Sequence, residues 1–293
     1  MRKVSRISQF AVRSSQFAVR SSHSYSLIHI AGIFRRFLGR IKRGVIRCTR
    51  IASDKFRDKH KYCIICGHKV GKFYPSGISA EIFTHHHIIG GGHRNNCTCP
   101  YCGNVDRSRW QYYVLQHFTE ITSAQGIRVL HFAPEVPNAK LIQSNPNCTY
   151  ITADIVPGRA DYTADMTNLF QFEDSSFDYV IANHILEHIP DEAKAFSELK
   201  RILKKDGKLI ISFPICTDMP TYEDPAITTE KERLKAYGQE DHVRLYGSDF
   251  REHVESYGLD VKIYQPEAVL SPEEVEKYAL IKDDIMMVCS VKA

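Results

Sequence analysis

Histidine and carboxylate side chains gather in two short segments whose chemistry suits proton transfer. His184 and His188 follow an apolar run, and the loop 237–247 carries the adjacent pair Asp241 and His242. Histidine ionises close to neutral pH, so it can take a proton from a hydroxyl or an amine as that group attacks. We interpret these four residues as candidate catalytic groups. A salt-bridged lid turn is an equally good interpretation of the loop.

Two C-x2-C pairs form the second chemical pattern. Cys63 and Cys66 make the first pair, and Cys99 and Cys102 make the second, with 32 residues between the pairs. Four thiolates complete a tetrahedral zinc site without an open position, so a structural zinc ion is predicted, with the segment 67–98 as a hairpin or loop. The alternative is four free cysteines of the core or surface. Other potential ligands nearby are His85, His86, His87, His93 and Cys97.

A βαβ unit must position the first histidine pair. The apolar run 177–182 predicts a buried parallel strand. A helix is expected next, with Pro190 in its first turn, apolar residues at helical spacing from Phe196 to Leu203, and Gly207 as its stop. The run 208–213 predicts the second strand. Because ligands collect at the carboxyl ends of such strands, His184 and its neighbours are expected at a site.

Further elements extend this unit in both directions. The apolar runs 127–132 and 149–153 predict two more parallel strands. A helix is expected over 248–257, followed by a strand over 261–264. The final apolar run, 285–291, is expected to pair antiparallel at the edge of the sheet.

Residues 176–212, SFDYVIANHILEHIPDEAKAFSELKRILKKDGKLIIS, resemble class I S-adenosylmethionine-dependent methyltransferases of the type 11 group. A narrower resemblance rests on VLHFAPE at 129–135, CPYCG at 99–103 and GQEDHVRLYG at 238–247. These motifs are similar to a zinc-knuckle-bearing class I subfamily whose substrates are mostly uncharacterised. The resemblance covers residues 62–293.

This resemblance implies a set of residues that bind S-adenosylmethionine. Asp154, at the end of the second strand, would accept hydrogen bonds from the ribose hydroxyls, and Asp165 with Met166 would contact the adenine. Asn183 and Leu186 would line the methionine end. The full set is His131, Phe132, Ala133, Glu135, Asp154, Asp165, Met166, Asn183 and Leu186. Ala133 and Glu135 stand where the family has glycines, and His131 stands where it has an acidic residue.

The expected fold class is therefore α/β, a Rossmann-like seven-stranded class I methyltransferase sheet with an N-terminal zinc-ribbon-like module. Three parts are predicted: a basic segment over 1–53, the zinc-knuckle module over 54–110 and the methyltransferase domain over 111–293.

The N-terminal segment carries most of the positive charge. Residues 1–53 contain ten Arg, two Lys and no acidic residue, and 27–45 has the pattern of a basic amphipathic helix. Such a helix binds the surface of anionic membranes, or serves as an organelle transit peptide. A cytoplasmic protein with peripheral membrane contact is predicted, with a mitochondrial or other organellar location, or a disordered tail, as alternatives.

The charge of the remaining chain helps to predict which kind of molecule accepts the methyl group. Of the 39 basic residues, 27 lie beyond residue 53, against 34 acidic ones. An acidic body does not favour nucleic acid, so a small-molecule, glycan or lipid-linked acceptor with an oxygen or nitrogen nucleophile is predicted. Two alternatives are an RNA methyltransferase that binds RNA through the zinc module and an inactive zinc-dependent scaffold. Nine cysteines, an odd number, favour a reducing compartment.

Overall fold

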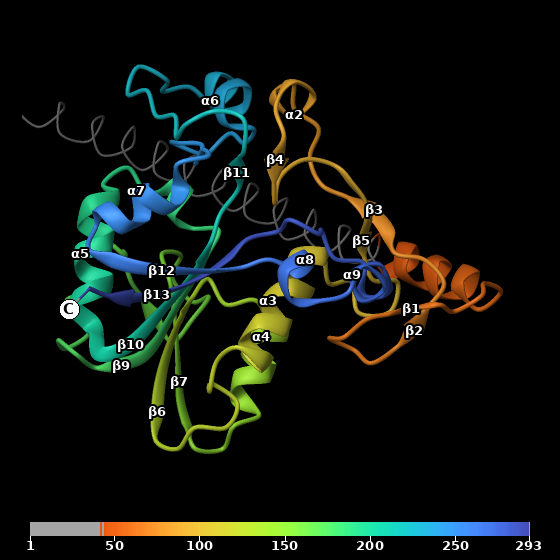
Figure 1. Cartoon of the computed structure of the whole chain (residues 1–293), viewed down its shortest axis with the longest axis horizontal. Helices are drawn as coiled ribbons and strands as arrows, with labels where there is room; N and C mark the ends of the chain where they lie inside the picture. The colour runs from red at the N-terminus through yellow and green to blue at the C-terminus, as the bar shows by residue number, and fades with distance from the viewer. Residues whose placement is uncertain (1–41, 43, 293) are drawn as a thin grey trace, which may run out of the picture. The chain divides into compact units, whose positions relative to one another are not determined.

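The computed structural model describes residues 42 and 44–292 (Figure 1), which belong to two compact units, the first ending at Phe56 and the second beginning at Arg57. The first unit contains a helix over 44–54. Most of the amphipathic segment expected over 27–45 lies outside the described residues. Within the described part of the chain, no helix is both long and apolar enough to cross a membrane.

The second unit is built on a seven-stranded sheet with the spatial order β8-β7-β6-β9-β10-β13-β12. All neighbouring pairs from β8 to β10 are parallel, and β13 runs antiparallel to both of its neighbours. This order confirms the predicted Rossmann-like α/β sheet. The strands are β6 (Ile127–Phe132), β7 (Cys148–Asp154), β8 (Tyr162–Thr163), β9 (Phe177–Asn183), β10 (Leu203–Ser212), β12 (Leu259–Tyr264) and β13 (Met286–Val291).

The last strand corrects one expectation. β13 pairs antiparallel, as predicted, but it lies between β10 and β12, and β12 forms the edge. Met286, Met287 and Cys289 are fully buried, so side chains on both faces of β13 are shielded from solvent. An interior position in the sheet provides this burial.

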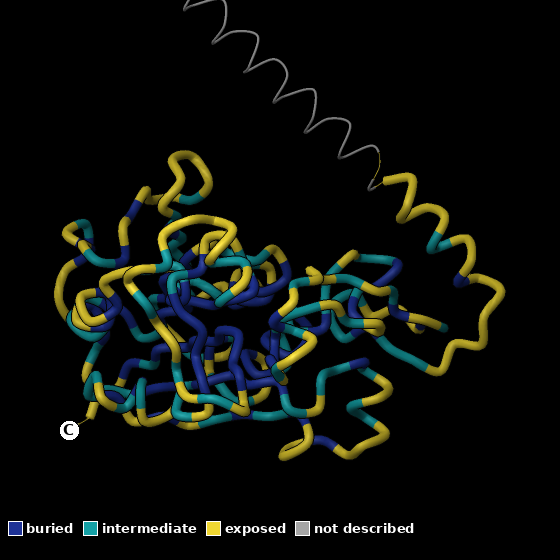
Figure 2. Tube along the Cα trace, turned by 90° about the horizontal axis from the view of Figure 1, so that it is seen from above, coloured by how far each residue is buried: buried dark blue, intermediate teal, exposed yellow. Residues whose placement is uncertain are grey.

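Helices cover both faces of the sheet. On one face, α5 (Glu192–Ile202) and α7 (Phe250–Ser256) pack their apolar residues against the strands. On the other, α3 (Asp106–His117), α4 (Val136–Gln143) and α9 (Pro272–Tyr278) contribute to a second core cluster, which also includes Leu270 after α8 (Pro266–Val269). Burial concentrates in the strands between these two layers (Figure 2). The helix α3 spans the boundary expected between residues 110 and 111.

The βαβ unit forms with two local differences from the prediction. Asp191 caps α5 by accepting a hydrogen bond from the backbone N–H of Lys194, so Pro190 lies before the helix rather than in its first turn. The helix ends at Ile202, and Gly207 lies inside β10, where the pairing with β9 shifts register. Gly207 is therefore not the helix stop. A Cβ there would lie 3.0 Å from backbone oxygens, which explains the glycine.

The segment before α3 carries the cysteine pairs and short strands. β1 (Lys61–Tyr62) pairs with β2 (Lys69–Val70), and β3 (Tyr74–Ser76) pairs with β5 (Arg94–Thr98). Between β3 and β5 lie α2 (Ile82–His85) and β4 (Ile88–Ile89). The strand β4 pairs with β11 (Ile215–Cys216), which follows β10, so the segment folds onto the carboxyl end of the sheet. The helix α6 (Glu230–Tyr237) lies beside α2.

Candidate active site

The carboxyl ends of β6 and β7 form the first part of the site. The N–H of Ala133 donates to the carbonyl of Ala153 over 2.8 Å, which holds the loop after β6 beside Asp154. Ala133 has φ of +43°, a left-handed conformation that glycine adopts with least strain. The loop therefore keeps a glycine-like backbone although alanine occupies the position. Strain of this kind is typical of ligand sites.

His131 supports this loop from within the core. The imidazole is fully buried, with Nε2 2.7 Å from the Glu135 carboxylate and Nδ1 3.0 Å from the Tyr150 hydroxyl. These contacts tie Glu135 to the sheet, so the geometry makes His131 a support of the loop.

A chain of hydrogen bonds continues from this loop to β9. Asn138 donates to Gln111 (3.2 Å), Gln111 donates to Ser212 (3.3 Å), and Ser212 donates to Asn183 (3.2 Å). The amide nitrogen of Asn183 is buried without a partner among the described residues. A buried donor of this kind indicates a missing acceptor.

The other predicted cofactor residues divide into exposed and buried groups. Asp154 accepts from the N–H of Val156 through Oδ1 (2.7 Å), and Asp165 accepts from Thr167 through its own Oδ1. The remaining carboxylate oxygen of Asp154 has no hydrogen-bond partner in the described part of the chain. Phe132, Met166 and Leu186 are buried in the core cluster.

The second part of the site is a cavity of about 280 Å³ beyond the end of β9. His184, Glu187, His188 and His242 line one side of it. The segment 76–94, which carries three consecutive glycines, lines the other. The structure thus brings together three of the four predicted catalytic residues, from segments more than 50 residues apart.

Backbone contacts align the two segments that carry the candidate catalytic residues. The N–H of Val243 donates to the carbonyl of Glu187 (2.9 Å). Arg244, which is 1% exposed, donates to the carbonyls of Leu186 (2.7 Å) and Ile189 (2.6 Å). Its guanidinium therefore holds the turn after β9 through these hydrogen bonds.

Asp241 differs from the other three predicted catalytic residues. Its side chain is 67% exposed, and one carboxylate oxygen lies 3.3 Å from Nδ1 of His188. His184 lies deeper, with Nδ1 3.3 Å from the Glu187 carboxylate. His184 also has a positive φ of +53°, so a second strained residue stands at the carboxyl edge of the sheet.

Burial controls ionisation on this side of the cavity. Burial raises the pKa of Glu187 to about 8. Burial, with the nearby Arg107 guanidinium, lowers the pKa of His184 well below its usual value. Burial and the adjacent His188 lower the pKa of His242 to about 4. The imidazoles of His184 and His242 are therefore neutral at neutral pH.

Two arginines at the cavity differ in their hydrogen bonds and ion pairs. Arg94 is paired with Asp106 (2.7 Å) and also donates to the carbonyls of Gly91 and Gly92. The Arg107 guanidinium lines the cavity and makes no hydrogen bond or ion pair among the described residues. Arg107 and the glycine-rich segment are not among the site residues predicted from the sequence. The GGG run at 90–92 was the available signal for the latter.

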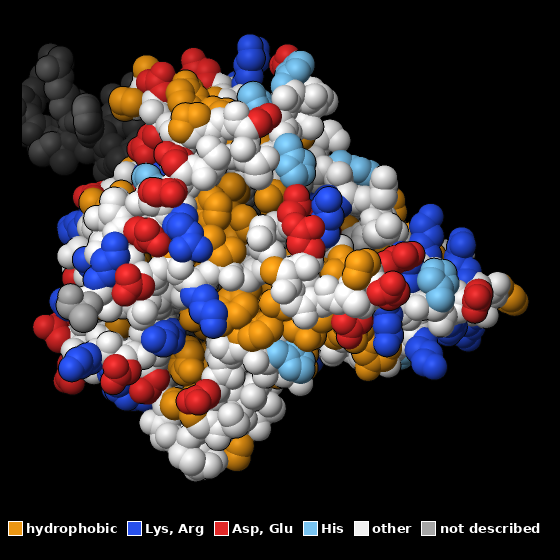
Figure 3. Space-filling model, in the orientation of Figure 1, with side chains coloured by type: hydrophobic (Ala, Val, Ile, Leu, Met, Phe, Trp, Pro, Cys, Tyr) orange, Lys and Arg blue, Asp and Glu red, His pale blue; other side chains and the backbone are white. Residues whose placement is uncertain are grey.

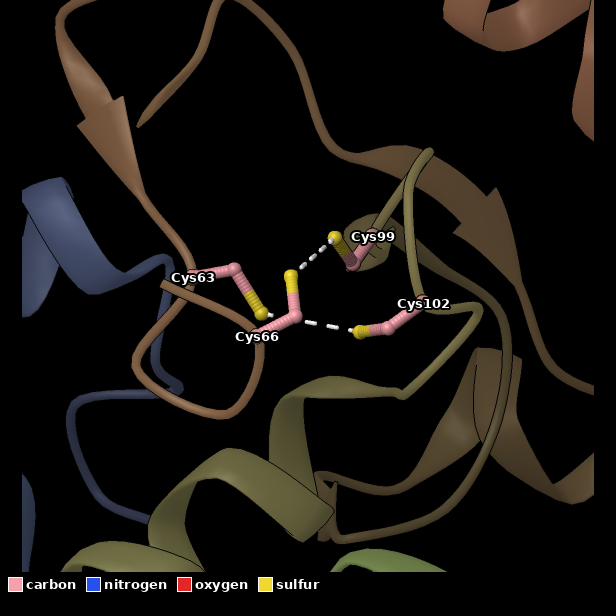
Figure 4. A group of neighbouring side chains, drawn as sticks. All are labelled: Cys63, Cys66, Cys99 and Cys102. Carbon is pink, nitrogen blue, oxygen red and sulfur yellow. Dashed lines mark hydrogen bonds between the residues drawn. The ribbon is translucent and has the colours of Figure 1, made fainter. Parts of the chain in front are cut away.

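The four cysteines of the two C-x2-C pairs converge in one place (Figure 4). Sγ of Cys63 lies 3.7 Å from that of Cys102, and Sγ of Cys66 lies 3.8 Å from that of Cys99. Four thiolates bound to one zinc ion at ~2.3 Å lie roughly 3.8 Å apart at the corners of a tetrahedron. The residues therefore fit a zinc ion.

The central part of the chain is similar to known proteins. Residues 128–211 match the family model described as a methyltransferase domain. A 54-residue stretch is 43% identical to phosphoethanolamine N-methyltransferase 2 of Caenorhabditis elegans. That match covers 18% of this chain and only 12% of the relative's length.

Two solved structures of low identity are similar to part of this chain. A SAM-dependent methyltransferase of Archaeoglobus fulgidus is 17% identical, with a TM-score of 0.41 over 64% of this chain and 94% of that one. The YcgJ protein of Bacillus subtilis is 15% identical, with a TM-score of 0.41 over 62% and 98%. The matched residues 128–211 run from β6 to β10, the strands whose carboxyl ends form the site. Over these residues the chain therefore matches a methyltransferase domain.

Proposed function

We propose that this protein transfers a methyl group to an oxygen or nitrogen of a small anionic acceptor bound in the cavity beyond β9. The observation that carries the proposal is the junction between Asn183 and His184. Asn183 ends the polar chain from the loop after β6, and His184 lines the cavity. A donor at the carboxyl ends of β6, β7 and β9 and an acceptor in the cavity would therefore meet at this turn.

The residues present fit S-adenosylmethionine. The left-handed backbone at Ala133 lets the loop approach a ligand closely, and Asp154 offers a free carboxylate oxygen to the ribose hydroxyls. Ile155, next to it, is apolar and 69% exposed, as a residue in contact with a planar ring would be. When bound, the cofactor supplies the methyl group. The chain supplies alignment of the acceptor, which accounts for much of the rate of such a transfer.

The cavity favours a small anionic acceptor over a polymer. At about 280 Å³ it is smaller than most pockets for drug-sized ligands. The unpaired Arg107 guanidinium would bind a phosphate or carboxylate group. The name of the Caenorhabditis elegans relative, a phosphoethanolamine N-methyltransferase, is consistent with an acceptor that carries both an amine and a phosphate.

Nucleic acid is less favoured as an acceptor. On the face drawn in Figure 3, Lys and Arg side chains are interspersed with Asp and Glu, with no continuous basic stripe in view. A phosphate backbone would need such a stripe.

We also propose that the four-cysteine group binds a structural zinc ion. The sulfur distances and the lack of a position for substrate support this role.

Titration calorimetry with S-adenosylhomocysteine tests the cofactor site. We expect micromolar binding, weakened at least tenfold by Asp154→Ala and unchanged by Asp206→Ala, an exposed carboxylate in the first half of β10. Failure of the wild-type protein to bind would overturn the proposal.

Methyl transfer from labelled cofactor then tests the acceptor class. Phosphate-bearing amines and alcohols should be methylated in preference to their neutral analogues. Arg107→Gln should raise KM for the anionic acceptors at least tenfold while cofactor affinity stays the same. Equal rates with neutral analogues would contradict the anionic class.

A further inference from the structure

Three side chains at the cavity offer metal-ligating atoms at close range. Glu187 and His188 come from the turn after β9. His242 comes from the loop 238–247, whose Tyr246 forms a β-bridge with Ile215 of β11. Their ligand atoms all lie within 4.8 Å of one another. The centroids of the two imidazole rings are 4.7 Å apart, with the rings nearly perpendicular. This group is separate from the four cysteines.

Two of the atoms in this group are buried and lack a partner. Oε2 of Glu187 and Nδ1 of His242 make no hydrogen bond to any described residue. Glu187 is 1% exposed and His242 is 5% exposed. A buried polar atom without a partner costs about 1–3 kcal/mol, so two of them side by side indicate a ligand that both contact.

The surroundings orient the group as outer partners orient metal ligands. His188 has Nδ1 3.3 Å from the Asp241 carboxylate, which leaves Nε2 for another contact. His242 has a backbone hydrogen bond at Tyr237, and its Nδ1 is the nitrogen without a partner. His184 lies 3.3 Å from Oε1 of Glu187, the other oxygen of the carboxylate. Histidine ligands commonly have their second nitrogen held by a carboxylate or a backbone carbonyl in this way.

We propose that Glu187, His188 and His242 bind a divalent transition-metal ion at the wall of the cavity. Two imidazoles and one carboxylate suit ions such as Mn²⁺, Fe²⁺, Co²⁺ and Zn²⁺, and they leave coordination positions open. The open positions would accept an oxygen of the acceptor, with Arg107 binding its anionic group. This role for the ion rests on the proposed function, whereas binding of the ion does not.

Electron paramagnetic resonance of Mn²⁺ titrated into the zinc-loaded full-length protein tests the site. Mn²⁺ prefers oxygen and nitrogen ligands, so it leaves the thiolate site to zinc. One Mn²⁺ should bind per chain. Glu187→Gln and His242→Gln should each weaken binding at least tenfold, and the matched control His117→Gln, an exposed histidine at the end of α3, should have no effect.

A third variant keeps the test informative if the first two variants fail to fold. Asp241 is exposed, so Asp241→Asn should leave the thermal midpoint unchanged and still weaken Mn²⁺ binding about tenfold through His188. No stoichiometric Mn²⁺ in the wild-type protein, or affinity unchanged in folded variants, overturns the metal site. Calorimetry with S-adenosylhomocysteine on the same samples reports separately on the proposed function.

Discussion

The guanidinium of Arg109 donates a hydrogen bond over 2.7 Å to the backbone carbonyl of Ala279, which lies 170 residues further along the chain. Arg109 is fully buried and stacks on Phe73, 4.1 Å from the ring centroid. It also donates to the carbonyls of Cys97 (2.9 Å) and Tyr278 (2.8 Å). One side chain in α3 thus joins the cysteine-bearing segment to the end of α9.

Arg109→Lys should therefore destabilise the protein strongly. Lysine has one compact ammonium group, which cannot reach carbonyls on opposite sides, so several buried acceptors lose their donor. We expect the free energy of unfolding to fall by about 3–5 kcal/mol in urea titrations. Arg159→Lys, at an exposed position, is the matched control and should change it by less than about 0.5 kcal/mol. A urea midpoint of Arg109→Lys equal to that of the wild type would contradict the conclusion that Arg109 joins the two segments.

Replacement of Ala133 by glycine should stabilise the protein. Because φ is +43° at this residue, glycine removes strain, and the free energy of unfolding should rise by about 0.5–1 kcal/mol. Ala139→Gly, in the interior of α4, is the matched control and should lower it by a similar amount.

Valine at the same position should have the opposite effect. A β-branched residue resists positive φ, so Ala133→Val should displace the loop and weaken S-adenosylhomocysteine binding at least tenfold in calorimetry. Unchanged affinity in this variant would show that the loop does not contact the cofactor.

Removal of one thiolate should release the zinc ion. Cys99→Ser should lower the zinc content from one ion per chain to less than half, as measured by plasma mass spectrometry, and lower the thermal midpoint. Cys148→Ser, a half-buried cysteine of β7 outside the group, should keep the full content. Wild-type protein purified without zinc, and with an unchanged midpoint after chelation, would exclude a structural ion.

The pair His253 and Glu192 should make stability depend on pH. Nε2 of His253 lies 2.7 Å from the Glu192 carboxylate, and this hydrogen bond raises the pKa of His253. Burial alone would raise the pKa of Glu192, but hydrogen bonds from His253 and Tyr246 outweigh it and lower that pKa.

A histidine whose pKa is raised on folding stabilises fully below its unfolded pKa and loses that stabilisation as pH rises through the folded pKa. The difference in unfolding free energy between wild type and His253→Gln should be about 1.5–3 kcal/mol near about pH 5.5 and should shrink toward pH 9. Chemical unfolding at several pH values measures it, with His117→Gln as the control. A difference that is constant with pH would contradict an ionic pair.

The sequence by itself determined the elements whose signal is local. The buried runs before Asn183 and Ser212 predicted their strands because a strand covered on both faces must be apolar throughout. The capping box of Ser271 and Glu274 at the start of α9 is also a local feature, because a cap needs only residues three apart. The two C-x2-C pairs were also readable, since each pair has its own fixed spacing.

Only the tertiary structure decided the features that depend on distant contacts. The strand β13 took an interior place because β12 covers it, and the apolar run itself does not reveal which neighbour does so. Glu187 and His242 became neighbours because the N–H of Val243 donates to the carbonyl of Glu187 and Arg244 holds the turn after β9. The cavity and its unpartnered atoms arise from packing between segments far apart in the chain, and no local spacing encodes them.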